Sequence, residues 1–426
     1  MTRRVSRRRF LQAVAAGAAA APFAHVPLRA DRAANGRITL GFIGVGTQNR
    51  GHLRSFLGNA DVQVVAVCDV VAERRDDAKR ITDERYTREA KGDYKGCTAH
   101  ADFRDLLARK DIDAVVIATP DHWHAIPCIL AARAGKDIYC EKPLTHHVAE
   151  GRRIVDEVAR AKVIFQTGSQ QRSEYESRFR KAVELVRNGR IGKVHTVHIG
   201  IGDPAVPCDL AEEPVPPGTD WDFWLGPAPK RGYNAVLCPK GVHRGYPNWR
   251  KYKEYAGGGV ADFGAHHYDI AQWALDMDNS GPVKIEPPEG DAKRGLKLTY
   301  ANGVVIHHGG RVDCQFEGTD GVIKVSRASL TTEPEKLLTE PLPEGGWRAY
   351  PSNNHRQNWV ECVKSRKPTI CPAEVGHRSA TVCHLTNIGY WLRRPLRWDP
   401  AAERFVGDEE ANRLLTRQPR EPWDKV

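Results

Sequence analysis

The sequence has no Cys-x-x-Cys pair, although ten of its 426 residues are cysteines. Because the cysteines are scattered singly, neither the spacing of a zinc site nor a disulfide framework is present. A chain of this length buries an apolar core of its own and does not need disulfides to fold. We therefore expect most cysteines to be small buried apolar residues, and we expect no metal site.

Long apolar runs and internal repeats are also absent, and no basic run occurs beyond residue 30. No stretch has the length and apolar character of a membrane-spanning helix, so we expect no membrane span. The net charge is +11, but the first thirty residues hold six arginines and no acid, so only +5 belongs to the rest. That remainder is spread out and lacks a nucleic-acid-binding motif, so we expect no nucleic-acid partner.

The first thirty residues have the three-part composition of an export signal. Arginines come first, an alanine-rich stretch follows, and small residues and prolines end the segment. Residues Ser6 to Leu11, SRRRFL, resemble the twin-arginine signal, whose machinery exports folded proteins. A basic disordered tail is the alternative. We predict that residues 1–30 are a twin-arginine signal and that the protein is periplasmic.

From Ile38 onward, apolar runs alternate with helical patterns. The apolar runs cover residues 37–46, 62–70, 111–120 and 136–143. Near-continuous apolar runs of this length are typical of strands buried on both faces of a parallel sheet. Residues 163–172 add a last strand. The alternation predicts a doubly wound α/β domain, a Rossmann domain, over residues 37–172.

Beyond residue 173 the pattern changes. Apolar residues alternate with period two, and Asn-Gly and Asp-Gly pairs within residues 297–310 and 314–327 are typical of hairpin turns. A proline-rich stretch over residues 207–234 is too long for a simple connection and is predicted to form a lid or wall. We predict an α+β domain with a large open, mostly antiparallel sheet over residues 173–426.

A glycine turn, Gly44-Val45-Gly46, follows the first predicted strand and precedes a helix. Such a turn lets the backbone approach a pyrophosphate at the helix N-terminus. The usual third glycine is replaced by Asn49, with Arg50 beside it, so the motif is imperfect. Asp69 ends the second strand, where a carboxylate accepts hydrogen bonds from a ribose and repels a 2′-phosphate. These residues predict a site for NAD, with NADP disfavoured; a structural turn and a solvated acid are the alternative.

Further candidate residues follow the strand at residues 111–120, at an edge where parallel sheets bind ligands. We assign five of them to the cofactor site: Thr119, Pro120, His122, Trp123 and His124. Two histidines around a tryptophan could ligate a metal, but no third ligand stands nearby. A helix-capping turn is the alternative.

Glu141 and Lys142 end the next strand and reach the same edge of the sheet. Pro143 keeps Lys142 in extended backbone. Lys142 therefore points into the cleft that the glycine turn and Asp69 border, instead of being an ordinary surface charge. We assign both Glu141 and Lys142 to the cofactor site and Lys142 also to catalysis.

In the second predicted domain, residues 257–270 read GGGVADFGAHHYDI, a glycine turn followed by a helical pattern. On one helix Asp262 and His266 share a face. An aspartate bonded to one histidine nitrogen leaves the other nitrogen free to accept a substrate proton. A buried Asp–His bond that only anchors the helix explains the pattern equally well.

These motifs occur in the order found in the Gfo/Idh/MocA oxidoreductase family, which the chain resembles from about Arg37 to its C-terminus. The resemblance is nearest to exported members with twin-arginine signals. It implies that the first domain binds NAD(P), and that the open sheet of the second binds a sugar or polyol and forms homo-oligomers. Lys142 matches the lysine of the family's EKP motif, and Asp262 and His266 match the pair of inositol-dehydrogenase-like members. Asn49 departs from the family's glycine turn.

The predicted reaction is reversible oxidation of a secondary hydroxyl of a sugar, polyol or glycoside. Lys142 and His266 bracket the hydroxyl, His266 accepts its proton, and Asp262 holds the imidazole. The charge of Lys142 favours an alkoxide-like transition state. Two other functions stay open. One is an NAD-dependent hydrolase or lyase that oxidises a glycoside transiently and cleaves it by elimination; the other is a non-catalytic sugar-binding protein.

Substrate contacts are predicted for aromatic and polar residues of the second domain. The predicted substrate-binding residues are Arg172, Tyr246, Trp249 and His267. Trp221 and Trp224 are further candidates for stacking on a sugar ring, with core packing or a subunit interface as the alternative. His355 and His377 are also candidate cleft residues.

Overall fold

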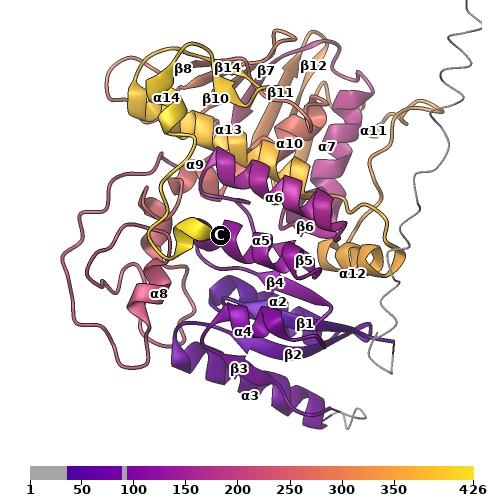
Figure 1. Ribbon diagram of the computed structural model, residues 1–426. Helices are drawn as coiled ribbons and strands as arrows, with labels where there is room; N and C mark the ends of the chain where they lie inside the picture. The colour runs from indigo at the N-terminus through magenta and orange to yellow at the C-terminus, as the bar shows by residue number, and fades with distance from the viewer. Residues whose placement is uncertain (1–35, 89–93) are drawn as a thin grey trace, which may run out of the picture.

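The computed structural model describes residues 36–88 and 94–426. Two sheets stand one above the other, the first built from the N-terminal half of the chain and the second from the C-terminal half (Figure 1). The predicted export signal, residues 1–30, lies outside the described residues. Within the described ranges, no helix is both long enough and apolar enough to span a bilayer.

In the described part of the chain, the first sheet has six parallel strands in the order β3-β2-β1-β4-β5-β6. The strands are β1 (Ile38–Ile43), β2 (Val62–Cys68), β3 (Thr98–His100), β4 (Ala114–Ile117), β5 (Asp137–Cys140) and β6 (Phe165–Thr167). Every residue of β1, β4 and β5 is buried, as the near-continuous apolar runs predicted. The strand order reverses between β1 and β4, and ligands bind such sheets at that crevice.

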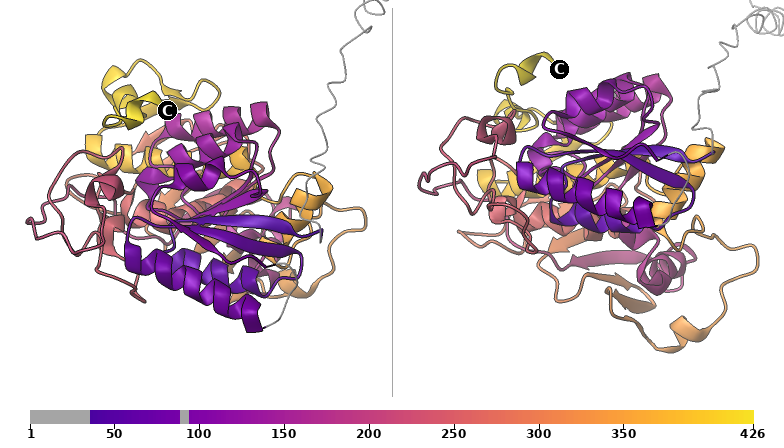
Figure 2. Two further views of the ribbon diagram at one scale, coloured as in Figure 1. Left: turned by 60° about the horizontal axis from the view of Figure 1, so that its bottom comes forward. Right: turned by 90° about the horizontal axis from the view of Figure 1, so that it is seen from below.

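Helices cover both faces of this sheet (Figure 2). They are α2 (Thr47–Leu57), α3 (Ala72–Arg88), α4 (Phe103–Ala108), α5 (Ala125–Arg133) and α6 (Val148–Ala161). The predicted doubly wound α/β domain is thus confirmed. Strand β3 was not predicted, because its three residues are partly exposed and too few to show a periodicity.

The second sheet has nine strands within the described residues, in the order β13-β12-β11-β7-β10-β9-β8-β14-β15. Only the β7–β10 pair in it is parallel, so the predicted mostly antiparallel sheet is confirmed. Its strands are β7 (Val194–Ile199), β8 (Lys284–Glu286), β9 (Lys297–Thr299), β10 (Val305–His308), β11 (Cys314–Gly318), β12 (Gly321–Val325), β13 (Leu330–Glu333), β14 (Leu396–Asp399) and β15 (Arg404–Phe405).

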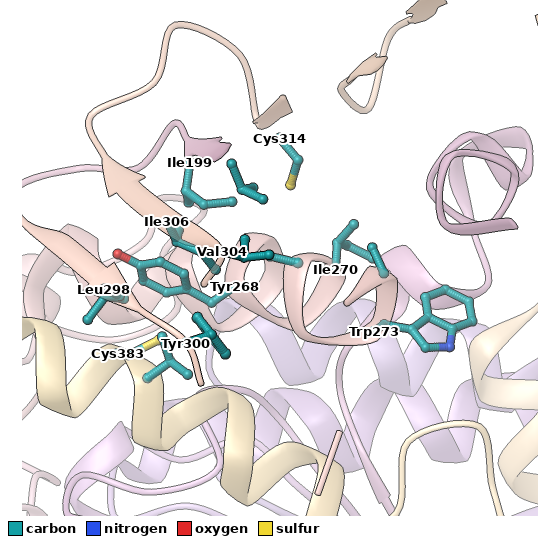
Figure 3. Packing of buried hydrophobic residues seen from close by; sticks show 14 of the residues in the cluster. Ile199, Tyr268, Ile270, Trp273, Leu298, Tyr300, Val304, Ile306, Cys314 and Cys383 are labelled. Carbon is teal, nitrogen blue, oxygen red and sulfur yellow. The ribbon is translucent and has the colours of Figure 1, made fainter. Parts of the chain in front are cut away.

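Helices pack on one face of the second sheet. The helices of this half are α7 (Arg178–Arg187), α8 (Trp221–Leu225), α9 (Gly258–Asp262), α10 (Gly264–Ala274), α11 (Lys336–Thr339), α12 (His355–Ser365), α13 (Ala373–Leu392) and α14 (Glu409–Arg413). Tyr268 and Ile270 of α10 lie among apolar side chains of the sheet (Figure 3). On the other face, alternate residues of β7 and β11 are partly exposed. The predicted homo-oligomer through this sheet stays a prediction.

Two C-terminal helices complete the packing of the first domain. Helix α13 contacts α10 on one side and α6 on the other. Trp359 of α12 is fully buried against Phe56 of α2 and Tyr139 of β5, with ring centroids 5.8 and 5.7 Å apart. The C-terminal helices therefore contribute to the hydrophobic core of the first domain.

The proline-rich stretch belongs to a long segment, residues 204–256, that we call the second-domain loop. It reaches back to the first domain, where Ala72 N donates to Gly218 O at 2.8 Å and Arg74 Nε donates to Gly241 O at 2.9 Å. Figure 1 shows this segment beside both sheets. All ten cysteines are free and nine are buried, which confirms their expected packing role.

Candidate active site

Two cavities adjoin between the domains. The first cavity, of about 820 Å³, lies between the glycine turn and the second-domain loop. The second cavity, of about 1110 Å³, lies beside Lys142, Asp262 and His266. The two cavities share lining residues: Gln48, Ala118, Thr119, Trp249 and Arg250.

The glycine turn leaves room for a phosphate. Gly44 has a φ of +74°, and a Cβ there would come within 2.9 Å of the Thr119 side chain, so only glycine fits. A Cβ at Gly46 would meet nothing within 4 Å. Gly46 precedes α2 without a side-chain cap, so the first amides of this helix are free to bind an anion.

Asp69 lines the first cavity and fixes the loops around it. Its Oδ2 accepts from Val45 N and its Oδ1 from Val71 N, both at 2.9 Å. Each carboxylate oxygen has a second lone pair that a ribose hydroxyl can use. The free helix N-terminus, the glycine cradle and this carboxylate fit a nicotinamide dinucleotide.

Asn49 and Arg50 do not line this cavity, and their predicted contact with the cofactor stays a prediction. Asn49 Nδ2 donates to the carbonyls of Ile43 and Val116, both at 3.2 Å, and so ties α2 to the first sheet. Arg50 forms an ion pair with Asp77 of α3. Both side chains lie on the buried side of α2, which the motif alone did not reveal.

The predicted residues after β4 divide into two groups. Thr119, Pro120 and Trp123 line the first cavity. His124 lines the second, and its ring nitrogens lie 2.8 Å from Pro143 O and 2.9 Å from Thr119 O. It therefore joins the loop that follows β4 to the loop that carries Lys142.

His122 lines neither cavity, and its predicted cofactor contact stays a prediction. Its ring packs against Trp224 and Tyr255, with centroids 5.2 Å from each, and its Nε2 lies 3.1 Å from Trp224 O. This packing attaches the second-domain loop to the first domain.

Lys142 points into the second cavity as predicted, and its partner is Asp262. Its Nζ donates to Asp262 Oδ1 at 2.8 Å and to Asp262 O at 2.7 Å. Burial raises the pKa of the Asp262 carboxyl, but the charges of Lys142 and Arg250 outweigh this and hold it below its ordinary value. The pair is therefore ionised and fixed in place.

His266 lines the same cavity but does not take Asp262 as its partner. Helix α9 ends at Asp262 and α10 begins at Gly264, so the two residues do not share one continuous helix. Among the described residues His266 Nδ1 is buried without a hydrogen-bond partner. Burial, with the nearby charge of Lys142, holds the pKa of His266 well below its ordinary value, so the ring is neutral and able to accept a proton.

Glu141 lines the second cavity beside Lys142. It accepts hydrogen bonds at 2.7 Å from His52 Nε2 and from Gln170 Nε2. Burial raises the pKa of Glu141, but the bond from His52 and the charge of Lys142 lower it to about 2. This carboxylate thus stays ionised and is held on the wall of the cavity.

Tyr246 and Trp249 line the second cavity, as their predicted substrate contacts require. The guanidinium of Arg250 lies 4.9 Å from the Tyr246 ring and 4.1 Å from the Trp249 ring. Tyr246 also donates to Gln48 Oε1 at 2.8 Å. The Tyr246 hydroxyl thus joins the second-domain loop to the first turn of α2.

Arg172 is fully buried and lines neither cavity, so its predicted substrate contact stays a prediction. It forms two-pronged ion pairs with Asp269 and Asp278 at 2.7–2.9 Å. His267 also lies outside the lining of the second cavity, with its Nδ1 2.9 Å from Gly200 O, and its predicted substrate contact stays a prediction.

The remaining candidates have structural partners. His355 is buried, with its nitrogens 3.1 Å from Ser173 Oγ and 2.8 Å from Thr167 O. His377 Nε2 lies 2.8 Å from Glu403 Oε1. Trp221 and Trp224 stack on each other at 4.7 Å in a small core inside the second-domain loop, and Trp224 also lines the first cavity.

Several cavity residues were not predicted as site residues. Asp121 lines the second cavity, although the sequence suggested only a helix cap. Its place just after a strand end was a usable signal. Tyr175, Arg327 and Arg356 also line it, and they lie in segments with no local motif. Among the described residues, no three histidine, cysteine, aspartate or glutamate side chains gather as a metal site.

Comparison with known proteins agrees with this geometry. The family model described as "Oxidoreductase family, NAD-binding Rossmann fold" matches residues 38–169. A second model, "Oxidoreductase family, C-terminal alpha/beta domain", matches residues 206–425. Both models belong to the Gfo/Idh/MocA family.

Curated inositol dehydrogenases are among the relatives of this chain. Myo-inositol 2-dehydrogenase of Thermotoga maritima is 32% identical over 39% of this chain, a stretch that covers 46% of that protein. Inositol 2-dehydrogenase 3 of Saccharopolyspora erythraea is 32% identical over 82% of this chain, a stretch that covers 92% of that protein.

Among solved structures, aldose-aldose oxidoreductase from Caulobacter crescentus shares the fold. Its TM-score is 0.56 at 18% identity, over 85% of this chain and 99% of that one. The chain therefore belongs to the Gfo/Idh/MocA family of oxidoreductases, with an NAD(P)-binding Rossmann domain followed by the family's C-terminal α/β domain.

Proposed function

We propose that the protein is an NAD-dependent dehydrogenase that oxidises a secondary hydroxyl of a sugar, polyol or glycoside. The observation that carries this proposal is the Lys142–Asp262 pair, at 2.8 Å, in a cavity that His266 also lines. This cavity adjoins the dinucleotide cavity, so a cofactor at the glycine turn can extend its nicotinamide toward the pair. The inositol dehydrogenases among the relatives support the choice of a polyhydroxylated substrate.

Bound NAD(P) supplies a hydride acceptor. Lys142 is the cationic donor, and its ammonium polarises the substrate oxygen as negative charge develops there. Asp262 keeps this ammonium in position. The sequence had suggested that Asp262 holds the imidazole, and in this proposal it does not. Neutral His266 accepts the hydroxyl proton through Nε2. Proton transfer to a positioned group of this kind contributes about 10²–10⁴-fold to a rate.

The second-domain loop excludes water from the dinucleotide site. It contributes Phe223, Trp224, Leu237 and Trp249 to the wall of the first cavity. Removing water strengthens each electrostatic interaction inside the site. A closed wall of this kind supports retention of the cofactor as well as hydride transfer.

The residues around Asp69 favour NAD over NADP. The carboxylate repels a 2′-phosphate, as the sequence suggested. Arg74 lines the cavity, but its guanidinium donates to the carbonyls of Gly241 and Pro239 in the second-domain loop. The nearby cation that a 2′-phosphate would use is therefore already engaged.

A panel of sugars, polyols and glycosides tests the proposal. NADH formation at 340 nm with the glycoside intact supports the dehydrogenase, and we expect Lys142→Ala to abolish it. Glycoside cleavage without net NADH supports the hydrolase or lyase instead. If no compound gives either signal but some bind, the protein is a binding protein and the proposal fails.

Export and assembly are also proposed. The SRRRFL segment supports export by the twin-arginine route to the periplasm. The partly exposed face of the second sheet supports a homo-oligomer. Fractionation of the producing cells and light scattering of the purified protein test these two points.

A further inference from the structure

The charges around the second cavity do not balance locally. Its cationic side chains are Lys142, Arg250, Arg327 and Arg356. Lys142 and Arg250 both lie beside Asp262, at 2.8 and 3.7 Å. Arg356 lies 3.7 Å from Glu174. Three of these cations therefore have a carboxylate neighbour.

Arg327, which follows β12, differs from the other three. Within residues 36–88 and 94–426 it forms no ion pair, and its Nε is buried with no hydrogen-bond partner. Asp313 accepts at 3.1 Å from the backbone amide of Arg327, and it forms no ion pair with the guanidinium. A buried donor without an acceptor is costly, so the position indicates an acceptor that arrives with a ligand.

The acids of the second cavity are already engaged. Glu141 is bonded by His52, Asp262 by Lys142, and Glu174 lies beside Arg356. Asp121 is the remaining acid, and burial raises the pKa of its carboxyl to about 8, so it is neutral at pH 7. One positive charge, on Arg327, is thus left uncompensated.

Aromatic rings hold this guanidinium in place. Its carbon lies 4.8 Å from the Tyr175 ring and 5.2 Å from the Phe263 ring. Tyr175, Glu176 and Ser177 have φ values of 59°, 53° and 58°, a left-handed conformation that such residues rarely adopt. Backbone strain of this kind is kept where it positions a group for a ligand. The strained turn sets Tyr175 against Arg327.

We propose that Arg327 binds a carboxylate of the substrate, which makes the substrate class a uronic acid or its glycoside. A carboxylate fits the planar fork of a guanidinium through two hydrogen bonds and brings the single negative charge that the cavity lacks. A phosphate dianion would bring a second charge with no cation to match it. This inference rests on the proposed dehydrogenase function and specifies its substrate.

The geometry relates the carboxylate to the reacting hydroxyl. The Phe263 ring lies near both groups, 5.2 Å from the Arg327 guanidinium and 6.4 Å from the His266 ring. Arg327 and His266 also line the same cavity. A pyranose in this cavity can therefore present a carboxylate to Arg327 and a hydroxyl to His266.

Matched pairs of sugars test the inference on the full-length protein. The pairs are the methyl glycosides of glucuronate and glucose, galacturonate and galactose, and mannuronate and mannose. In at least one pair we expect kcat/KM to favour the acid by tenfold or more. If every neutral sugar equals or exceeds its acid, the inference is overturned.

Variants locate the effect. Arg327→Gln should lower kcat/KM for the acid by about ten- to a hundredfold, the range for a lost charged hydrogen bond, and change the neutral sugar less than threefold. Arg327→Lys should restore part of the loss because it keeps the charge without the fork. Arg397→Gln, an exposed residue of β14 at the other end of the sheet, is the matched control and should behave as wild type. Equal losses on acid and neutral sugars in Arg327→Gln would contradict the assignment.

A binding measurement separates this inference from the proposed function. Calorimetry with the NAD-loaded protein is run with each uronide and with glucose 6-phosphate. Uronide binding that Arg327→Gln abolishes, without NADH formation, supports the inference and defeats the dehydrogenase proposal. NADH formation from neutral sugars without uronide binding supports the dehydrogenase proposal and defeats the inference about the carboxylate. Binding of glucose 6-phosphate alone overturns the carboxylate assignment.

Discussion

Replacing Asp121 with asparagine is expected to remove a loss of stability that occurs as the pH rises. Burial raises the pKa of the Asp121 carboxyl to about 8, because it outweighs the opposing charges of Arg250 and Lys142. In the unfolded chain the ordinary value of 3.8 applies. Between these values the folded protein holds a proton that the unfolded chain has released. The contribution is therefore fully present below about pH 4 and lost progressively up to about pH 8.

The slope of the free energy of unfolding against pH gives the size of this loss. One proton of difference costs about 1.4 kcal/mol for each pH unit within this window. Between pH 5.5 and 7.5 the wild type should lose roughly 2–3 kcal/mol through Asp121 alone. Asparagine keeps the shape of the side chain and does not ionise, so the variant escapes this loss. For a chain of this size the difference corresponds to about 2–3 °C in melting temperature.

Thermal unfolding of both proteins at pH 5.5, 6.5 and 7.5 measures this difference. The gap between Asp121→Asn and wild type should widen with pH in favour of the variant. Asp320→Asn, at an exposed position between β11 and β12, is the control and should follow the wild type. Parallel curves for wild type and Asp121→Asn would show that Asp121 is ionised throughout, and the reasoning would fail.

Three further substitutions have definite expected outcomes. Asp262→Asn removes the charged partner of Lys142 and should lower kcat/KM about ten- to 150-fold in steady-state assays, whereas an unchanged value would remove Asp262 from the mechanism. Gly44→Ala places a Cβ against Thr119 at positive φ and should cost about 1–3 kcal/mol, seen as a lower melting temperature and weaker NAD binding by titration. Arg172→Leu leaves two carboxylates unpaired and should cost about 3–5 kcal/mol in thermal unfolding. A folded Arg172→Leu protein with only its sugar KM changed would instead support the substrate contact of Arg172.

Local sequence patterns predicted the features that depend on one strand end at a time. The apolar runs fixed the parallel strands, and the common edge of a parallel sheet then placed Asp69, Thr119 and Lys142 near one another. Strand β3 was not predicted because its three partly exposed residues show no periodic pattern. The sheet edge therefore gave the most reliable predictions in the site.

Local sequence patterns did not show where a helix is interrupted or which charges are paired. The spacing of Asp262 and His266 implies contact only on an unbroken helix. The helix is interrupted at Phe263, and Asp262 pairs with Lys142 instead. Arg172 has the residue type of a ligand, but its buried partners lie about a hundred residues away. Arg327 lacks any local motif, and only the packed structure shows that its charge is unmatched.

The burial of Trp359 against Phe56 and Tyr139 has a consequence for how the chain assembles. A fragment that ends near residue 172 would expose the apolar surface that α12 and α13 cover in the whole protein. We therefore expect the nucleotide-binding half to complete its core only after α12 and α13 have been synthesised. Truncation from the C-terminal end should thus impair dinucleotide binding well before it reaches any residue of the dinucleotide site.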